Sequence, residues 1–98
     1  MYSSMWILKP YPGKMDASKK TVKKMCAKWK KHGAVEANAA ILFGADYGHI
    51  GMIVRCKSME HYGKCNDKLN ADPQVIKLLK EGELNGEIIR HTLGRRFT

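Results

Sequence analysis

The order in which strand-like and helix-like patterns follow one another is the feature that most constrains how this chain can fold. Short apolar or alternating runs indicate strands, and apolar residues at a helical spacing indicate amphipathic helices. The expected elements, in chain order, are a strand at 3–9, a helix up to 33, strands at 34–44 and 49–57, a helical region at 58–82 and a strand at 87–93. This order is that of the ferredoxin-like βαββαβ arrangement. We therefore expect an α+β fold with an antiparallel sheet and helices on one face.

Capping residues predict where the helices begin. Asp16 or Ser18 is expected to be the N-cap of the first helix, because both residue types accept hydrogen bonds from free backbone N–H groups. Ser58 is expected to cap the second helical region in the same way. Asp72 followed by Pro73 predicts a new N-cap and first turn, which would break this region into two helices.

Alternation along the strands divides their residues between two sheet faces. One face is almost wholly apolar and is expected to lie under the helices; it holds Met5, Ile7, Ala37, Ala39, Ile41, Phe43, Ile50, Met52 and Val54. The other face is mixed and is expected to hold Trp6, Leu8, Glu36, Asn38, Leu42, Ile53, Arg55 and His91. A face this apolar is usually covered, and a second copy of the same sheet is the simplest cover. The sequence therefore predicts a homodimer that encloses a cavity between two sheets.

Length and charge narrow the choice further. The 98 residues suit a single domain spanning positions 1–98, and the formal net charge is +9. Much of this charge is interleaved with apolar residues at a helical spacing, which is the pattern of an amphipathic helix with a solvated face. The apolar residues of this helix are Val22, Met25, Cys26 and Trp29. The lysines concerned are Lys19, Lys20, Lys23, Lys24, Lys28, Lys30 and Lys31. We do not expect a nucleic-acid partner, because strand 49–57 lacks the aromatic side chains that stack on bases. An anion- or RNA-binding module acting through the lysine-rich helix is a second alternative function.

The cysteines and the N-terminal region predict the compartment. Cys26, Cys56 and Cys65 form no CxxC pair, so we expect reduced thiols without a disulfide framework or a zinc ribbon. His61 and Cys65 have the i, i+4 spacing of two metal ligands, but no third ligand is evident, and we expect no metal and no cofactor. The apolar patch at 5–8 is too short for a signal segment or a membrane span. The expected location is cytoplasmic.

Three short segments carry a resemblance to a known superfamily. Residues 43–48 read Phe-Gly-Ala-Asp-Tyr-Gly, residues 58–63 read Ser-Met-Glu-His-Tyr-Gly, and residues 71–73 read Ala-Asp-Pro. In this pattern the chain resembles small dimeric α+β barrel proteins, over a little more than half of its length. The resemblance implies the ferredoxin-like fold and a dimer. That superfamily includes monooxygenases that need no external metal, haem-degrading enzymes, stress-response proteins and members without an assigned activity, and fold does not choose among them. The haem-degrading members use a histidine, an asparagine and a tryptophan. This chain offers Trp6, Asn38 and His91, but their order and elements do not match that pattern.

The mixed sheet face is the predicted ligand site. Its aliphatic, aromatic and polar side chains suit a small hydrophobic or amphipathic molecule, such as a fatty-acid-like ligand whose carboxylate meets Arg55 or His91. The predicted ligand-binding residues are Trp6, Leu8, Asn38, Leu42, Ile53, Arg55 and His91. The alternative is a cofactor-independent monooxygenase-like enzyme in the same cavity, with His91, His49 or Glu36 as its base. The sequence leaves open whether the protein is an enzyme.

Overall fold

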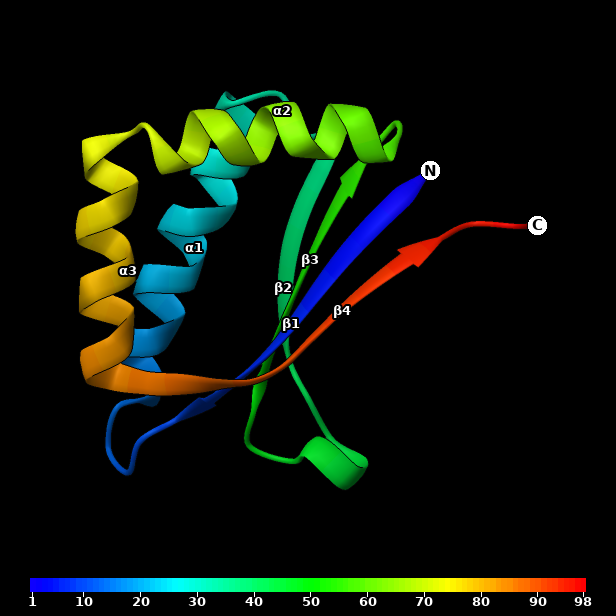
Figure 1. Ribbon diagram of the computed structural model, residues 1–98. Coiled ribbons are helices and arrows are strands. Elements are labelled where there is room, and N and C mark those ends of the chain that lie inside the picture. Colours follow the sequence, from blue (N-terminus) through cyan, green and yellow to red (C-terminus); the bar gives the residue numbers. More distant parts are fainter.

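The computed structural model describes all residues 1–98 and has three helices on one side of a four-stranded sheet (Figure 1). The elements are β1 (Tyr2–Pro10), α1 (Met15–Lys31), β2 (Glu36–Ile41), a 3₁₀ turn (Gly44–Asp46), β3 (Ile50–Cys56), α2 (Met59–Asn70), α3 (Pro73–Asn85) and β4 (Gly86–Arg95). The expected ferredoxin-like order is confirmed, including the break of the second helical region into α2 and α3.

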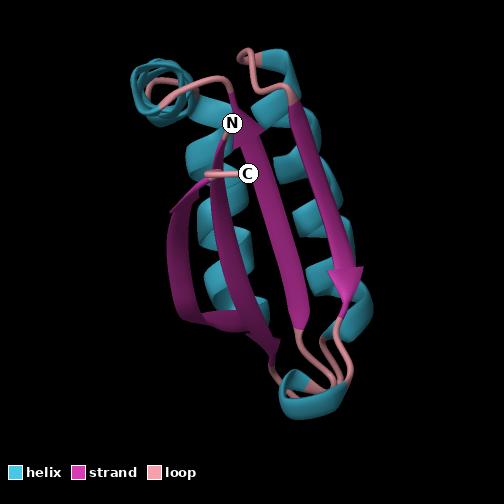
Figure 2. Cartoon of the chain, turned by 90° about the vertical axis from the view of Figure 1, so that its right-hand side faces the viewer, coloured by secondary structure: helices cyan, strands magenta, loops and turns pink.

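The sheet is antiparallel throughout, with the strand order β2-β3-β1-β4. All three helices lie behind one face, and no element covers the other, which faces the viewer in Figure 2. We call the covered side the helix face and the uncovered side the open face. None of the three helices is long and apolar enough to cross a bilayer.

Two of the three expected N-caps are confirmed. The Ser58 hydroxyl accepts a hydrogen bond from the His61 N–H at 3.1 Å, and the Asp72 carboxylate accepts one from the Gln74 N–H at 2.9 Å. The expectation for α1 was wrong, because this helix begins at Met15, before both proposed caps. Ser18 lies buried inside it and donates a hydrogen bond to the Asn85 carbonyl at 3.2 Å, which ties α1 to the end of α3.

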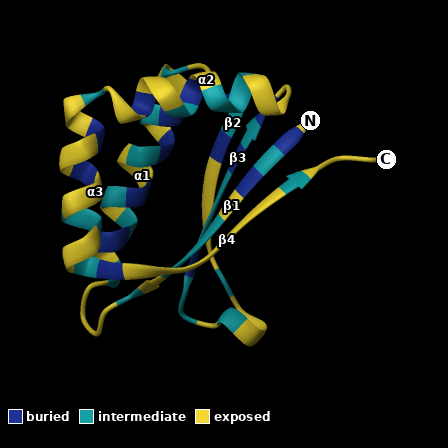
Figure 3. Ribbon diagram, in the orientation of Figure 1, coloured by how far each residue is buried: buried dark blue, intermediate teal, exposed yellow.

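The core lies between the helix face of the sheet and the three helices, with its largest helical share from α1 (Figure 3). Val54 and Cys56 of β3 are fully buried, and Trp29 of α1 is 3% exposed above them. All three cysteines are unpaired and buried. Burial raises the pKa of the Cys56 thiol to about 11, with the neighbouring Cys65 thiol adding to the effect, so Cys56 stays protonated near neutral pH.

The expected faces are confirmed for β3 and wrong for β1. Ala37 of β2 and Ile50, Met52 and Val54 of β3 do belong to the helix face, as their register and packing show. In β1, however, Trp6 pairs with Met52 and Leu8 pairs with Ile50, so Trp6 and Leu8 share that face. Met5 and Ile7, expected there, lie on the open face instead, and Met5 is 40% exposed.

Corrections are also needed at the sheet edges. His91 of β4 pairs with Trp6 of β1 and therefore lies on the helix face. Ile53, which was expected to share a face with His91, lies on the open face. The register shifts between Ile7 and Leu8, so that Ile89 is passed over as a β-bulge. Phe43 follows the end of β2, is 75% exposed and is not part of the buried face. Its ring lies against that of Tyr47, with 5.9 Å between the centroids.

Candidate ligand cavity

A cavity of about 560 Å³ lies between the helix layer and the sheet. Its walls are mainly apolar and come from every layer of the fold. The apolar lining consists of Trp6, Leu8, Ile50, Met52 and Ile88 from the sheet, Val22, Met25 and Trp29 from α1, and Leu69, Val75, Leu78 and Leu79 from α2 and α3. The cavity is therefore inside the single chain, on the opposite side of the sheet from the cavity expected between two sheets.

The polar part of the lining carries carboxylates and amides but no cation. Asn66 and Asn70 lie one turn apart on α2, and Glu83 of α3 and Glu87 of β4 are exposed at the side where these elements meet. The lining includes no lysine, arginine or histidine. A ligand in this cavity would meet the amides at the α2 end and negative charge at the opposite end, where β4 begins (Figure 1).

Stacked aromatic rings form one end of the cavity wall. Trp6 and Trp29 meet with their ring centroids 5.7 Å apart at a tilt of 43°. Outside the cavity, the His91 ring stacks on Trp6 at 4.4 Å, and the Tyr62 ring stacks on Trp29 at 5.5 Å. Each tryptophan is therefore held between two rings, which fixes the position of the flat surfaces that a ligand would touch.

A buried serine links the two outer rings by hydrogen bonds. The Ser4 hydroxyl is fully buried and lies 2.6 Å from Nε2 of His91 and 3.0 Å from the Tyr62 hydroxyl. Burial raises the pKa of the Tyr62 hydroxyl, while its hydrogen bond with Ser4 acts in the opposite direction. A neutral Tyr62 can donate to Ser4, whose own proton then goes to an unprotonated Nε2 of His91. This arrangement holds the ring series in place from behind.

The structure divides the predicted ligand-binding residues into two groups. Trp6 and Leu8 line the cavity, and His91 lies beside it, stacked on the far side of Trp6. The other four residues are on the open face or at its edge: Asn38, Leu42, Ile53 and Arg55. Their register pairs Asn38 with Ile53 and Glu36 with Arg55, and Leu42 lies over Gly51.

The charged residues of the open face are already paired with each other. The Arg55 guanidinium donates to the Glu36 carboxylate at 2.6 Å, so it is not available to a ligand in the cavity. At the opposite end of this face, Arg90 donates to Asp46 at 2.9 Å. His49 lies 3.9 Å from the same carboxylate, and its Nδ1 is buried without a hydrogen-bond partner.

The lining residues missed by sequence analysis belong to the helices. Val22, Met25 and Trp29 were expected only as the buried stripe of an amphipathic helix, and their spacing does give that signal. Asn66 and Asn70 gave no signal, because two amides one turn apart are equally common on a solvated helix face. His61 and Cys65, considered as a metal pair, both lie next to Gly33, and Nδ1 of His61 accepts a hydrogen bond from the Lys57 N–H.

Solved structures of the same fold cover nearly the whole chain. The protein Atu4242 from Agrobacterium tumefaciens is 17% identical with a TM-score of 0.78, over 97% of this chain and 92% of that one. SnoaB, a cofactor-independent oxygenase from Streptomyces nogalater, is 10% identical with a TM-score of 0.75, over 99% and 93% of the two chains. A candidate antibiotic biosynthesis monooxygenase from Deinococcus radiodurans is 12% identical with a TM-score of 0.76, over 100% and 94%.

These structures share the ferredoxin-like α+β fold of this chain. The resemblance noted in the sequence is thereby confirmed for the fold. Identities this low extend to the fold alone and not to the activity of any neighbour. No protein-family model matches the sequence, and no curated protein does.

Proposed function

We propose that this barrel-fold protein binds a small apolar or amphipathic molecule in the cavity between its sheet and helices α1 and α3. The observation that carries this proposal is the cavity itself, about 560 Å³ with mainly apolar walls. Protein interiors are normally close-packed, and pockets for small molecules range over about 300–1,000 Å³. The rings of Trp6 and Trp29 supply a rigid apolar surface for such a ligand.

The charge of the lining favours a ligand with a neutral or cationic polar end. A fatty-acid-like ligand was expected to place its carboxylate on Arg55 or His91, but Arg55 is on the open face and paired with Glu36. A carboxylate in the cavity would instead meet Glu83 and Glu87, and like charges repel. An alcohol, amide or amine could donate hydrogen bonds to these carboxylates.

A cofactor-independent oxygenase using the same cavity is the second candidate, and its support is the likeness of fold to SnoaB. Such chemistry needs a base within hydrogen-bond reach of the substrate. Of the three bases considered from the sequence, His91 lies behind Trp6, while His49 and Glu36 lie toward the open face. The ionisable groups that do line the cavity are Tyr11, Glu83 and Glu87, all of them exposed. This distribution favours binding over proton abstraction.

We also propose that the protein is a homodimer whose second copy covers the open face. Met5, Ile7 and Ile53 form an apolar area across β1 and β3 there, and Leu42 extends it. Salt bridges stand at its two ends, Glu36–Arg55 and Asp46–Arg90. An apolar centre with a charged rim is the usual composition of a protein interface.

The binding proposal is tested with a neutral fluorescent probe, N-phenyl-1-naphthylamine, and two matched sets of variants. Met25→Trp combined with Met52→Trp narrows the cavity from two walls, whereas Met5→Trp adds the same side chain on the open face. We expect the cavity variant to weaken probe binding about tenfold or more and the open-face variant to leave it unchanged. Circular dichroism checks that each variant is folded. Equal effects from both sets, or a wild-type protein that does not bind the probe, would contradict the proposal.

A further inference from the structure

The solvent side of α1 carries a group of exposed lysines. At about 100° per residue, the positions opposite the buried stripe of Val22, Cys26 and Trp29 are those on the outer side of the helix. Lys20, Lys24 and Lys31 lie opposite the buried stripe, and Lys23 and Lys30 flank them at about 80–100° from it. All five are exposed, and we call them the lysine stripe. Asp16 is the only acidic residue of α1, so the charge of this face is not balanced from within the helix.

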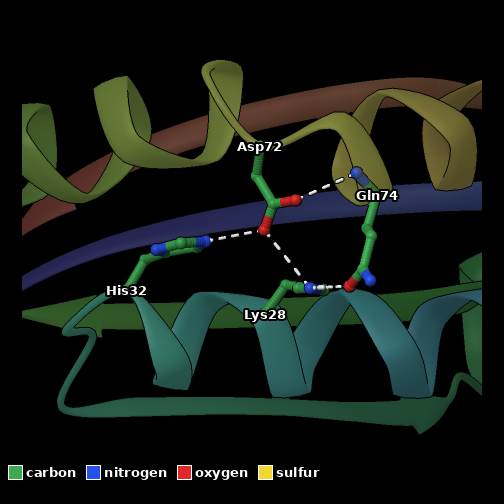
Figure 4. Close-up of polar contacts among 4 residues, drawn as sticks. All are labelled: Lys28, His32, Asp72 and Gln74. Atoms are coloured by element: carbon green, nitrogen blue, oxygen red, sulfur yellow. Dashed lines mark hydrogen bonds and ion pairs between the residues drawn. The ribbon is translucent and has the colours of Figure 1, made fainter.

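The lysine stripe is also not neutralised by neighbouring elements. Asp72, at the start of α3, is the acidic side chain that contacts α1, and it is occupied by Lys28 at 3.2 Å and by His32 at 2.9 Å (Figure 4). Lys28 also donates to the Gln74 side chain. None of the five stripe lysines forms an ion pair. Lys28 is thus part of a structural contact, and the stripe remains free for a partner.

The dimensions of the lysine stripe suit a nucleic-acid duplex. Eleven residues separate Lys20 from Lys31, which is about 16 Å along a helix axis. Each strand of a DNA duplex carries one negative charge per about 3.4 Å of the axis, so four or five phosphates of one strand could approach the stripe. The inner side of α1 is packed against the sheet, so the helix backbone is fixed in position. The lysines of its outer side therefore keep their relative positions.

The side chains between the lysines lack the features that insertion into a bilayer and stacking on unpaired bases require. Ala27 is the exposed apolar residue within the stripe, so the face has nothing to insert into a bilayer. It has no aromatic side chain on which an unpaired base could stack. Contacts to phosphates need neither feature, and lysine makes them as a point charge without reading bases.

We propose that the lysine stripe of α1 binds the phosphate backbone of a nucleic-acid duplex without reading its sequence. The missing aromatics of strand β3 do not bear on this site, because it lies on the opposite side of the molecule from the open face. The same helix lines the ligand cavity with Val22 and Met25 on its inner side. One helix would thus serve a small molecule on one side and a polyanion on the other.

The test measures fluorescence anisotropy of labelled RNA and DNA duplexes of about 24 base pairs over about 50–200 mM salt. We expect binding whose log–log salt dependence has a slope of about −4, and no preference between unrelated sequences. Reversal of three stripe charges, Lys20→Glu with Lys23→Glu and Lys24→Glu, should weaken binding about tenfold or more and reduce the slope by about three. Lys57→Glu with Lys77→Glu and Lys80→Glu makes the same change in net charge on β3–α2 and α3 and should have a much smaller effect.

Three results would overturn this proposal. An equal loss in both triple variants would show attraction by overall charge and not by α1. Absence of duplex binding at about 50 mM salt would remove the site altogether. Binding to vesicles containing phosphatidylserine, lost in the stripe variant, without binding to duplexes would assign the stripe to a membrane surface. Near-ultraviolet circular dichroism of each variant confirms that the fold is retained, and probe binding in the cavity is expected to be unchanged in both.

Discussion

Replacing Ser4 by alanine should be more costly than the loss of one small side chain suggests. Ser4 is fully buried, and its hydroxyl has two partners, Tyr62 at 3.0 Å and His91 at 2.6 Å. Each hydrogen bond contributes about 0.5–1.5 kcal/mol net, and a buried hydroxyl left without a partner costs about 1–3 kcal/mol. We expect Ser4→Ala to lower the free energy of unfolding by about 2 kcal/mol. In a domain of this size that lowers the melting temperature by about 8–16 °C.

A double-mutant cycle in urea separates the hydrogen-bond effect from packing. Tyr62→Phe removes the hydroxyl that Ser4→Ala would leave unpaired, so the double variant should lose about 1 kcal/mol less than the sum of the two single changes. The denaturant slope should stay constant across the set, because the fold does not change. Additivity to within about 0.3 kcal/mol, or a loss below about 0.5 kcal/mol for Ser4→Ala alone, would refute the reasoning.

Three further predictions concern other parts of the fold. The hydrogen bond from His32 holds the pKa of the Asp72 carboxyl well below its usual range. The stability that the ionised carboxylate adds is therefore complete above about pH 4 and is lost as pH falls through the folded-state pKa. The difference in the free energy of unfolding between wild type and Asp72→Asn should shrink on acidification, and a constant difference would contradict this. Ile53→Glu on the open face should convert the proposed dimer to monomer in sedimentation velocity, and an unchanged dimer would place the interface elsewhere. Gly86→Ala would bring a Cβ within 2.8 Å of a carbonyl oxygen of β1 and should cost about 1–3 kcal/mol, whereas Gly63→Ala, in open space on α2, should stabilise by about 0.5–1 kcal/mol in the same melts.

The faces of the central strands were predictable to different degrees for a physical reason. In β3, Gly51 and Arg55 interrupt the apolar residues, and this fixes which positions point to the helices. In β1, residues 5–8 are all large and apolar and satisfy either orientation equally well. The orientation is decided by Ser4, whose partners come from α2 and β4, 58 and 87 residues away in the sequence. A buried polar residue with such distant partners leaves no local signal.

The burial of part of the cavity lining was predictable, but the position of the cavity was not. The apolar stripe of α1, including Val22 and Trp29, was expected from its helical spacing. Whether the stripe packs directly against the sheet or leaves a space depends on the distance between α1 and the sheet. This distance is set by how α3 packs, which is a tertiary property. The position of His91 was unpredictable for another reason, because a bulge in β4 breaks the alternation on which the expectation relied.

That bulge gives β4 one spare residue. Ile88 pairs with Leu8 and Arg90 pairs with Ile7, so Ile89 has no partner on β1 and is 44% exposed. A chain that lacked Ile89 could keep every one of these pairings in an unbroken ladder, with His91 still beside Trp6. Loss of a residue between 90 and 95 would instead turn the side chains beyond it to the wrong face. We therefore expect insertions and deletions in this strand among natural relatives to occur at position 89. A designed insertion or deletion in β4 should be placed there.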